Sequence, residues 1–186
     1  TMRDLLFNQE LPIDIPYSKS HIQLTADSGD EDLIQTVIGQ GKTQITPLHL
    51  CMITSAIAND GLLMRPYEME RIESADGKII KQFQAQQYRR LMTSEEAAAL
   101  RGLMIDVVEE GTASRLSGLT YTAAGKTGSA EFNQNKADSH AWFTGFAPAD
   151  HPEIAVTVII EGIGSGSDYA VPIAKRIFDA YFNAGF

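Results

Sequence analysis

The sequence predicts an α+β fold in which an antiparallel sheet is flanked by helices. Helical patterns come first along the chain, three strand patterns follow, and a last helical pattern closes it, unlike the regular alternation of a parallel α/β sheet. The chain has 186 residues, 44% of them hydrophobic and 21% charged, which suits one globular domain. No stretch approaches the ~18 consecutive apolar residues of a membrane span.

The first forty residues show no regular pattern and are expected to form an extended loop. Pro12 and Pro16 interrupt the segment and favour irregular backbone. An acidic cluster follows, and its residue order lacks the spaced ligands and central glycine of a calcium-binding EF-hand loop. We therefore expect a solvated acidic loop, formed by Asp27, Asp30, Glu31 and Asp32.

The first clear helix is expected to begin at Thr46 and Pro47. Threonine can cap the free amides of a helix, and proline is tolerated at the first helical position. The Asn-Asp-Gly run at 59–61 is expected to end this helix. Further on, a small surface hairpin is expected at the Ala-Asp-Gly turn of residues 75–77, with residues 78–83 extended after it.

The strongest helical pattern covers residues 94–110. Thr93 and Glu96 have the spacing of a capping box, and Gly111 is expected to end the helix. The apolar face expected to pack on the core is formed by Leu100, Leu103, Met104 and Val107.

Three strands are expected after this helix. The first begins at Tyr121 and runs through residues 125–128, and a polar loop over 133–139 follows it. The second and third strands cover 140–147 and 154–161. Their short connection predicts an antiparallel hairpin.

A last helix is expected after the glycine- and serine-rich turn at 164–167. Residues 162–169 are expected to form either the rim of a cleft or only the turn before this helix. The apolar stripe of the helix is formed by Val171, Ala174, Ile177, Phe178 and Tyr181.

The aromatic residues of the second strand have two interpretations. Trp142, Phe143 and Phe146 are expected to pack on the two faces of the sheet rather than to form a ligand cage, because strand residues alternate between faces.

His140 has no second histidine or carboxylate near it in sequence. We therefore expect a structural or surface role for His140 rather than a catalytic one.

Charge and cysteine content exclude several classes of function. The net charge of −9 and the pI near 4.8 make nucleic acid a poor partner. Residues 113–130 are an exception, because this stretch contains Arg115 and Lys126 and no acidic residue, which suits an anionic group of a ligand. The single Cys51 can form neither an intrachain disulfide nor a multi-cysteine metal site.

Two Gly-Lys-Thr triplets, at 41–43 and 125–127, could suggest nucleotide binding. A phosphate-binding loop needs a glycine five residues before the triplet and a helix directly after it. Thr36 and Thr120 occupy those earlier positions, and neither triplet leads directly into a predicted helix. Nucleotide binding is therefore not favoured.

The second triplet also reads Lys126-Thr127-Gly128, a signature of active-serine penicillin-recognising enzymes. On a strand beside a cleft, such an edge can pair with a peptide backbone, and Gly128 would let that backbone approach closely. Lys126 would supply positive charge, and the hydroxyls of Thr127 and Ser129 would bind a carboxylate. The amide of Ser129 could donate into an oxyanion hole. The alternative is a tight turn with an exposed lysine.

The surrounding segments add a family resemblance. Residues 124–131 (AGKTGSAE) and 140–148 (HAWFTGFAP) closely resemble the C-terminal half of class B penicillin-binding protein transpeptidase domains. The runs at 38–41 (IGQG), 46–48 (TPL) and 110–113 (EGTA) resemble further segments of that family, in the same order.

The resemblance implies an α/β penicillin-recognising fold, with residues 1–186 as the C-terminal part of a single transpeptidase domain. In that family a serine attacks the D-Ala-D-Ala end of a peptidoglycan stem peptide, and β-lactams acylate the same serine. The signatures that supply the nucleophile and its base, Ser-x-x-Lys and Ser-x-Asn, do not occur in this sequence. Because a nucleophilic serine needs an adjacent base, the chain alone is expected to be inactive.

The same resemblance implies the partners and the location. The partners are the stem peptide, β-lactam antibiotics and the missing N-terminal half of the domain, and exposed surfaces could also join two copies. No cofactor and no metal is implied. The intact protein is expected at the extracytoplasmic face of the bacterial cell membrane. The alternatives are a non-catalytic β-lactam-sensing domain and a fragment of a class D-like serine β-lactamase.

Overall fold

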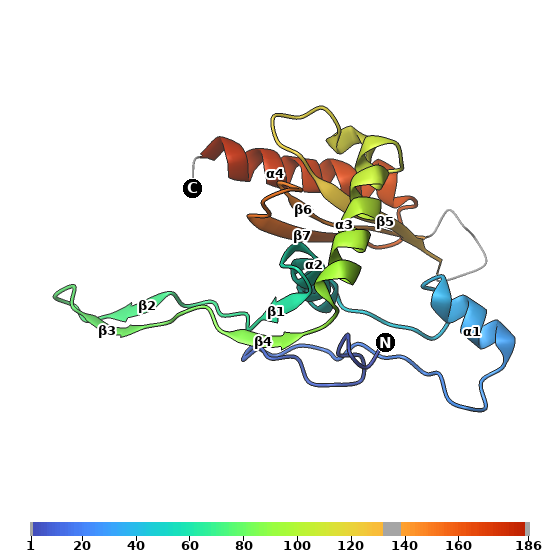
Figure 1. Cartoon of the computed structure of the whole chain (residues 1–186), viewed down its shortest axis with the longest axis horizontal. Coiled ribbons are helices and arrows are strands. Elements are labelled where there is room, and N and C mark those ends of the chain that lie inside the picture. The colour runs from blue at the N-terminus through green and yellow to red at the C-terminus, as the bar shows by residue number, and fades with distance from the viewer. Residues whose placement is uncertain (1, 132–138, 185–186) are drawn as a thin grey trace.

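The computed structural model describes residues 2–131 and 139–184 (Figure 1). Most of the polar loop expected over 133–139 lies outside the described residues. The helices and strands, in chain order, are α1 (Asp30–Val37), α2 (Pro47–Ala58), β1 (Leu62–Met64), β2 (Arg71–Glu73), β3 (Ile79–Gln82), β4 (Gln87–Arg90), α3 (Ser94–Glu109), β5 (Ala124–Ala130), β6 (His140–Ala147), β7 (Ile154–Ile160) and α4 (Val171–Ala184).

The three predicted strands form one antiparallel sheet in the order β5-β6-β7. This confirms the predicted fold class and the predicted antiparallel hairpin of the second and third strands. β5 begins at Ala124 rather than at Tyr121. The Tyr121 hydroxyl donates to a carboxylate oxygen of Asp179 in α4 at 2.8 Å, so the residues before β5 are held by the helix and not by the sheet.

Helices cover both faces of this sheet (Figure 1). On the α4 face, Phe143 and Phe178 are fully buried and stand edge to face, with ring centroids 6.5 Å apart. On the α2 face, Phe146 is fully buried among α2 side chains. The two phenylalanines of β6 therefore point to opposite faces, as the strand alternation predicts.

Both predicted helix caps are present. The Thr46 hydroxyl accepts a hydrogen bond from the backbone amide of His49 at 3.2 Å, at the start of α2. Thr93 and Glu96 exchange the two bonds of a capping box at the start of α3. These caps satisfy amides that the first turn of a helix leaves unpaired.

The predicted apolar face of α3 is wrong in part. Met104 is buried as expected, but Leu100 and Leu103 are 39% and 63% exposed, and the other buried residues are Ala97 and Val108. The exposed leucines lie about 60–120° round the helix from the buried line.

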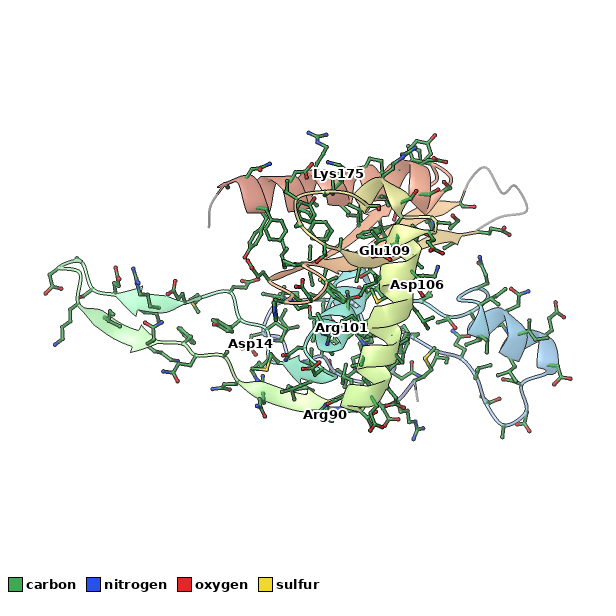
Figure 2. All side chains as sticks on the ribbon, turned by 45° about the horizontal axis from the view of Figure 1, so that its top comes forward. Asp14, Arg90, Arg101, Asp106, Glu109 and Lys175 are labelled. Carbon is green, nitrogen blue, oxygen red and sulfur yellow. The ribbon has the colours of Figure 1, made fainter. Side chains whose placement is uncertain are left out.

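The position of α3 beside the sheet explains this difference. Met104 packs in the cluster of the α2 face, whereas Val108 and the half-buried Val107 pack in the cluster of the α4 face. The helix thus passes from one side of the sheet to the other and buries a narrow line of side chains. On the α2 side, Arg101 (labelled in Figure 2) forms an ion pair with Asp60 at 2.6 Å.

Residues 30–37 form α1, which contradicts the expected extended, acidic loop. Asp30, Glu31 and Asp32 occupy the first turn of this helix, where negative charge is favoured by the helix dipole. Gly39 ends the helix with φ +76°. The acidic residues therefore mark the start of a helix. Four apolar residues that follow them are 50–76% exposed: Leu33, Ile34, Val37 and Ile38.

The expected surface hairpin is present as β2 and β3, which pair antiparallel across Gly77 (φ +81°). It projects from the body of the molecule (Figure 1). The short pair β1 and β4 at its base was not predicted.

A single π-helical turn, Gly166–Ala170, precedes α4. Of the predicted stripe of α4, Val171, Ala174 and Phe178 are buried, while Ile177 is 38% exposed. In the part of the chain that the structure describes, no helix combines the length and apolar character needed to cross a membrane.

Candidate functional site

The four candidate residues Lys126, Thr127, Gly128 and Ser129 lie on β5. The alternative interpretation of this segment as a tight turn is therefore wrong. β5 pairs with β6 on one side only, and no strand among the described residues pairs with its other edge. The candidate residues therefore lie on a free strand edge.

Two backbone carbonyls of β5 point to this free edge. The Ser129 carbonyl accepts a hydrogen bond from Nε2 of Gln40 at 3.3 Å. The Thr127 carbonyl accepts one from Nζ of Lys126 at 2.6 Å. In an antiparallel strand the amide and the carbonyl of one residue point the same way. The amides of Thr127 and Ser129 therefore also face outward, and the edge presents alternating donors and acceptors.

The hydroxyls of Thr127 and Ser129 are held by different parts of the fold. Oγ1 of Thr127 is 2.5 Å from Oγ1 of Thr112, in the segment after α3. Oγ of Ser129 accepts a 3.4 Å hydrogen bond from the amide of Gly166, in the π-helical turn before α4. The residues 162–169, for which a cleft rim or a simple turn was expected, therefore form a turn that also supports β5.

Glycine is required at 166 and packs tightly at 128. A Cβ at Gly166 would lie 2.2 Å from the carbonyl oxygen of Trp142 and 2.6 Å from that of Gly128. A Cβ at Gly128 would lie 3.3 Å from Cβ of Trp142. A side chain at position 128 would therefore be crowded by Trp142, the residue opposite it on β6.

The free edge of β5 forms one wall of a cleft of about 1200 Å³. Residues of the segment between Gln35 and Ile45, which connects α1 to α2, form the opposite wall. Of the described residues that line this cleft, Lys126 is the one lysine or arginine, whereas Glu131 and Glu161 are acidic. The cleft is long enough to face several residues of β5, and its permanent positive charge lies beside the two outward carbonyls.

A chain of threonine hydroxyls supports the sheet beneath Lys126. Thr144, which is opposite Lys126 in the register, is 2.6 Å from the hydroxyl of Thr54 in α2 and 2.7 Å from that of Thr157 in β7. The Thr54 hydroxyl also donates to the carbonyl of Leu50. Because buried hydroxyls are costly unless they are paired, this chain fixes α2 against the strands that carry the site.

The hydroxyls on the β5 and β6 wall pair with other hydroxyls or with backbone groups. Among the described residues, the hydroxyls of Thr127, Ser129 and Thr144 form no hydrogen bond with a lysine, histidine or carboxylate. Nδ1 of His140 accepts from the amide of Gly162 at 3.1 Å, which supports the structural role expected for this residue.

Gly41 and Thr43 of the first Gly-Lys-Thr triplet line the other wall of the cleft, whereas Lys42 does not. Lys42 forms an ion pair with Asp32 at 3.4 Å, and the exposed positions of both side chains make this a surface contact. The triplet is separated from α2 by three further residues and does not form the start of a helix.

Two further residues, Gln40 and Thr112, belong to the site, although they were not predicted from the sequence. Both lie in segments that carried the family resemblance, 38–41 and 110–113. Their spacing from Ser129 and Thr127 gave no sign of contact, since Gln40 and Ser129 are 89 residues apart. Glycines on either side of Gln40 were a usable signal of an ordered turn.

Comparisons with known proteins agree with this geometry. The sequence model described as "Penicillin binding protein transpeptidase domain" matches residues 1–179. The chain is 34% identical over 155 residues to peptidoglycan D,D-transpeptidase PbpA of Mycolicibacterium smegmatis, which covers 80% of this chain and 31% of that protein. It is also 34% identical over 172 residues to peptidoglycan D,D-transpeptidase MrdA of Haemophilus influenzae, covering 82% and 26% of the two chains.

The solved structure of penicillin-binding protein A from M. tuberculosis, an imipenem acyl-enzyme complex, matches with a TM-score of 0.83 and 30% identity, over 97% of this chain and 40% of that one. The D,D-transpeptidase domain of a peptidoglycan glycosyltransferase from Eggerthella lenta matches with a TM-score of 0.84 and 25% identity, over 97% and 46%. The chain thus spans less than half of each of these relatives. With a family match over nearly all of its length, the chain belongs to the penicillin binding protein transpeptidase domain family.

Proposed function

We propose that this chain is the substrate-binding C-terminal part of a serine-type peptidoglycan D,D-transpeptidase. The observation that carries the proposal is the free edge of β5, where the outward amide and carbonyl of Ser129 lie beside Lys126 in a cleft. An extended peptide can add to such an edge through its backbone, and the adjacent cation can bind its terminal carboxylate.

Each candidate residue has a role in this proposal. Gly128, which has no side chain, lets the backbone of the bound peptide approach β5 closely. Lys126 and the hydroxyls of Thr127 and Ser129 bind the carboxylate of a D-Ala-D-Ala end or of a β-lactam. The amide of Ser129 donates to the carbonyl oxygen that becomes negatively charged during acyl transfer. The serine that forms the acyl-enzyme, with the release of the terminal D-alanine, comes from a Ser-x-x-Lys segment that these residues do not contain. The chain alone is therefore inactive.

The complementary segment of the domain is the principal protein partner in this proposal. The face of α1 formed by Leu33, Ile34, Val37 and Ile38 is 50–76% exposed, as is expected of a surface that another part of the domain covers. The whole protein acts at the extracytoplasmic side of the cell membrane, where its substrate is found.

The isolated chain should consequently self-associate. Analytical ultracentrifugation at micromolar concentrations should show dimers or larger species, and Ile34→Lys together with Val37→Lys should shift the distribution toward the monomer. A wild-type chain that stays monomeric would contradict the assignment of this face as a covered surface.

The test of the function itself uses membranes of the source cells. They are labelled with fluorescent penicillin, separated by size and probed with an antibody to this chain. The proposal expects one band, well above the 20.3 kDa of this chain, that carries both signals. An antibody-positive band without the penicillin label would contradict it. Release of the bound penicillin within minutes would favour a β-lactamase instead.

A further inference from the structure

A glutamine side chain crosses the cleft and binds the edge of β5. Nε2 of Gln40 donates to the carbonyl of Ser129 at 3.3 Å, although Gln40 belongs to the opposite wall. The contact therefore lies at the point where the proposed function places the backbone of a ligand.

The backbone of Gln40 is fixed by the end of α1. The amide of Gly39 donates to the carbonyl of Thr36 at 3.1 Å, and the amide of Gln40 donates to that of Gln35 at 2.7 Å. With Gly39 at φ +76°, these two bonds make a Schellman motif, a standard ending of an α-helix. Gly41 follows at φ +72°, where a Cβ would lie 3.1 Å from Cβ of Gln35. The turn thus holds Gln40 in place opposite β5.

A peptide that adds to the free edge of β5 must donate its own backbone N–H to the outward carbonyl of Ser129. In the structure the carboxamide of Gln40 donates to this carbonyl. Resting on the proposed function, we propose that Gln40 is a specificity-determining residue. Its carboxamide competes with any ligand that pairs with the Ser129 carbonyl through an amide N–H, and such a ligand must displace it. A ligand without that N–H leaves the Gln40 hydrogen bond in place.

The energetic consequence follows from the exchange of hydrogen bonds. An amide ligand gains one bond to Ser129 but breaks the bond from Gln40, so the wild-type residue reduces the net gain. Without the Gln40 donor, the same ligand gains the bond at no such cost. The net worth of one exposed neutral hydrogen bond corresponds to about a two- to fivefold change in the rate of acylation.

Two β-lactams separate these cases. Penicillin G carries an acylamino group whose N–H can pair with a strand edge, whereas imipenem has a hydroxyethyl group in its place. The experiment measures the second-order rate of acylation of the whole protein, which includes the Ser-x-x-Lys segment, by both compounds. We expect Gln40→Met to increase the rate with penicillin G about two- to fivefold and to leave the rate with imipenem unchanged.

Further variants separate the hydrogen bond from the polarity of the side chain. Gln40→Asn keeps the carboxamide but shortens its reach by one methylene, so it should behave like Gln40→Met. Gln44→Met makes the same change in the same wall at a residue that bonds to His21 through its backbone, and should alter neither rate. The variants are compared by the ratio of the penicillin G rate to the imipenem rate within each protein. Differences in stability among the variants then affect both rates alike and cancel in the ratio.

The outcomes distinguish this inference from the proposed function. A penicillin G rate that is unchanged or reduced in both Gln40 variants, or an equal rise with both antibiotics, would overturn the role of Gln40 and leave the transpeptidase assignment intact. A whole protein that neither antibiotic acylates would overturn the proposed function first.

Discussion

The two faces of the β5-β6-β7 sheet are built from different chemistry. The α4 face is closed by apolar and aromatic side chains, with Phe143 packed on Phe178. The α2 face has an apolar part around Phe146, but next to it lies the hydroxyl chain of Thr54 and Thr144, and this side extends into the cleft. One face thus mainly contributes stability, while the other combines packing with the positioning of polar groups.

This difference suggests why polar groups are retained inside the domain. A buried hydroxyl chain adds less stability than a well-packed apolar cluster, but its directional bonds fix two elements in one relative position. Thr144 is opposite Lys126 in the register, so the chain acts on the strand that carries the site. Variants on the two faces should therefore separate stability from ligand binding.

The largest effect is expected on the α4 face. Phe178→Ala should lower the free energy of unfolding of the whole domain by about 3–5 kcal/mol, because it leaves a large cavity against Phe143. Thermal unfolding measures the loss. The neighbouring Ile177→Ala, at a residue that is 38% exposed, is the control and should cost much less. Equal losses for both variants would show that the face does not pack as described.

Removing the positive charge of the cleft should strongly affect acylation but hardly affect stability, the reverse of the Phe178 variant. Lys126→Ala should slow acylation of the whole protein by penicillin about ten- to a hundredfold, because a charge-assisted bond to the ligand carboxylate is lost. Its melting temperature should change little, since Lys126 is exposed. Lys42→Ala removes the same charge from a residue that does not line the cleft and should leave acylation nearly unchanged. An unchanged rate in the Lys126 variant would contradict its role in binding.

The hydroxyl chain should show an intermediate loss. Thr144→Val keeps the shape of the side chain but leaves the hydroxyls of Thr54 and Thr157 without this partner, at a cost of about 1–3 kcal/mol. A double-mutant cycle with Thr54→Val measures the coupling by thermal unfolding. Additive effects would indicate that the two hydroxyls do not act as a unit.

The sequence predicted the parts of the fold that depend on local signals. The capping box at Thr93 and Glu96, the turn at Gly77 and the alternation along β6 each involve residues close together in the chain, and all three are confirmed. The apolar face of α3 was wrong in part, because which side of a helix is buried depends on where it lies against a sheet that forms later in the sequence.

The candidate site was predictable in one strand and not across the cleft. The signature at 126–129 located one wall, but nothing in the spacing could place Gln40 against Ser129. α1 was missed because its acidic first turn was interpreted as a solvated loop, although negative residues at a helix start are favoured. The acidic residues at 30–32 were a usable signal of a helix start. They were compared only with a calcium-binding loop and a solvated loop, so the helix was not considered.

The smallest predicted effect separates the two faces by pH. On the α2 side, burial lowers the pKa of His49, whose Nε2 lies 2.7 Å from the carbonyl of Leu5. Because the folded state disfavours the charged ring, stability from this group is present above the unfolded pKa of about 6.5 and is lost as the pH falls below it. On the α4 side, the ammonium of Lys175 (labelled in Figure 2) and the Tyr121 hydroxyl lower the pKa of Asp179. Stability from this carboxylate is therefore lost only below about pH 4.

Unfolding free energies measured from pH 7.5 to pH 3 should therefore fall in two stages, the first from the α2 side. His49→Gln can keep a donor to the Leu5 carbonyl without titrating, and it should flatten the dependence between about pH 7 and pH 5 while leaving the acid stage in place. Asp179→Asn should leave the first stage in place and reduce the acid stage only in part, because the pKa values of Glu10, Asp76, Glu96 and Asp150 are lowered as well. If His49→Gln left the first stage unchanged, another group would be responsible for it, and the α2 side would be no more sensitive to mild acid than the α4 face.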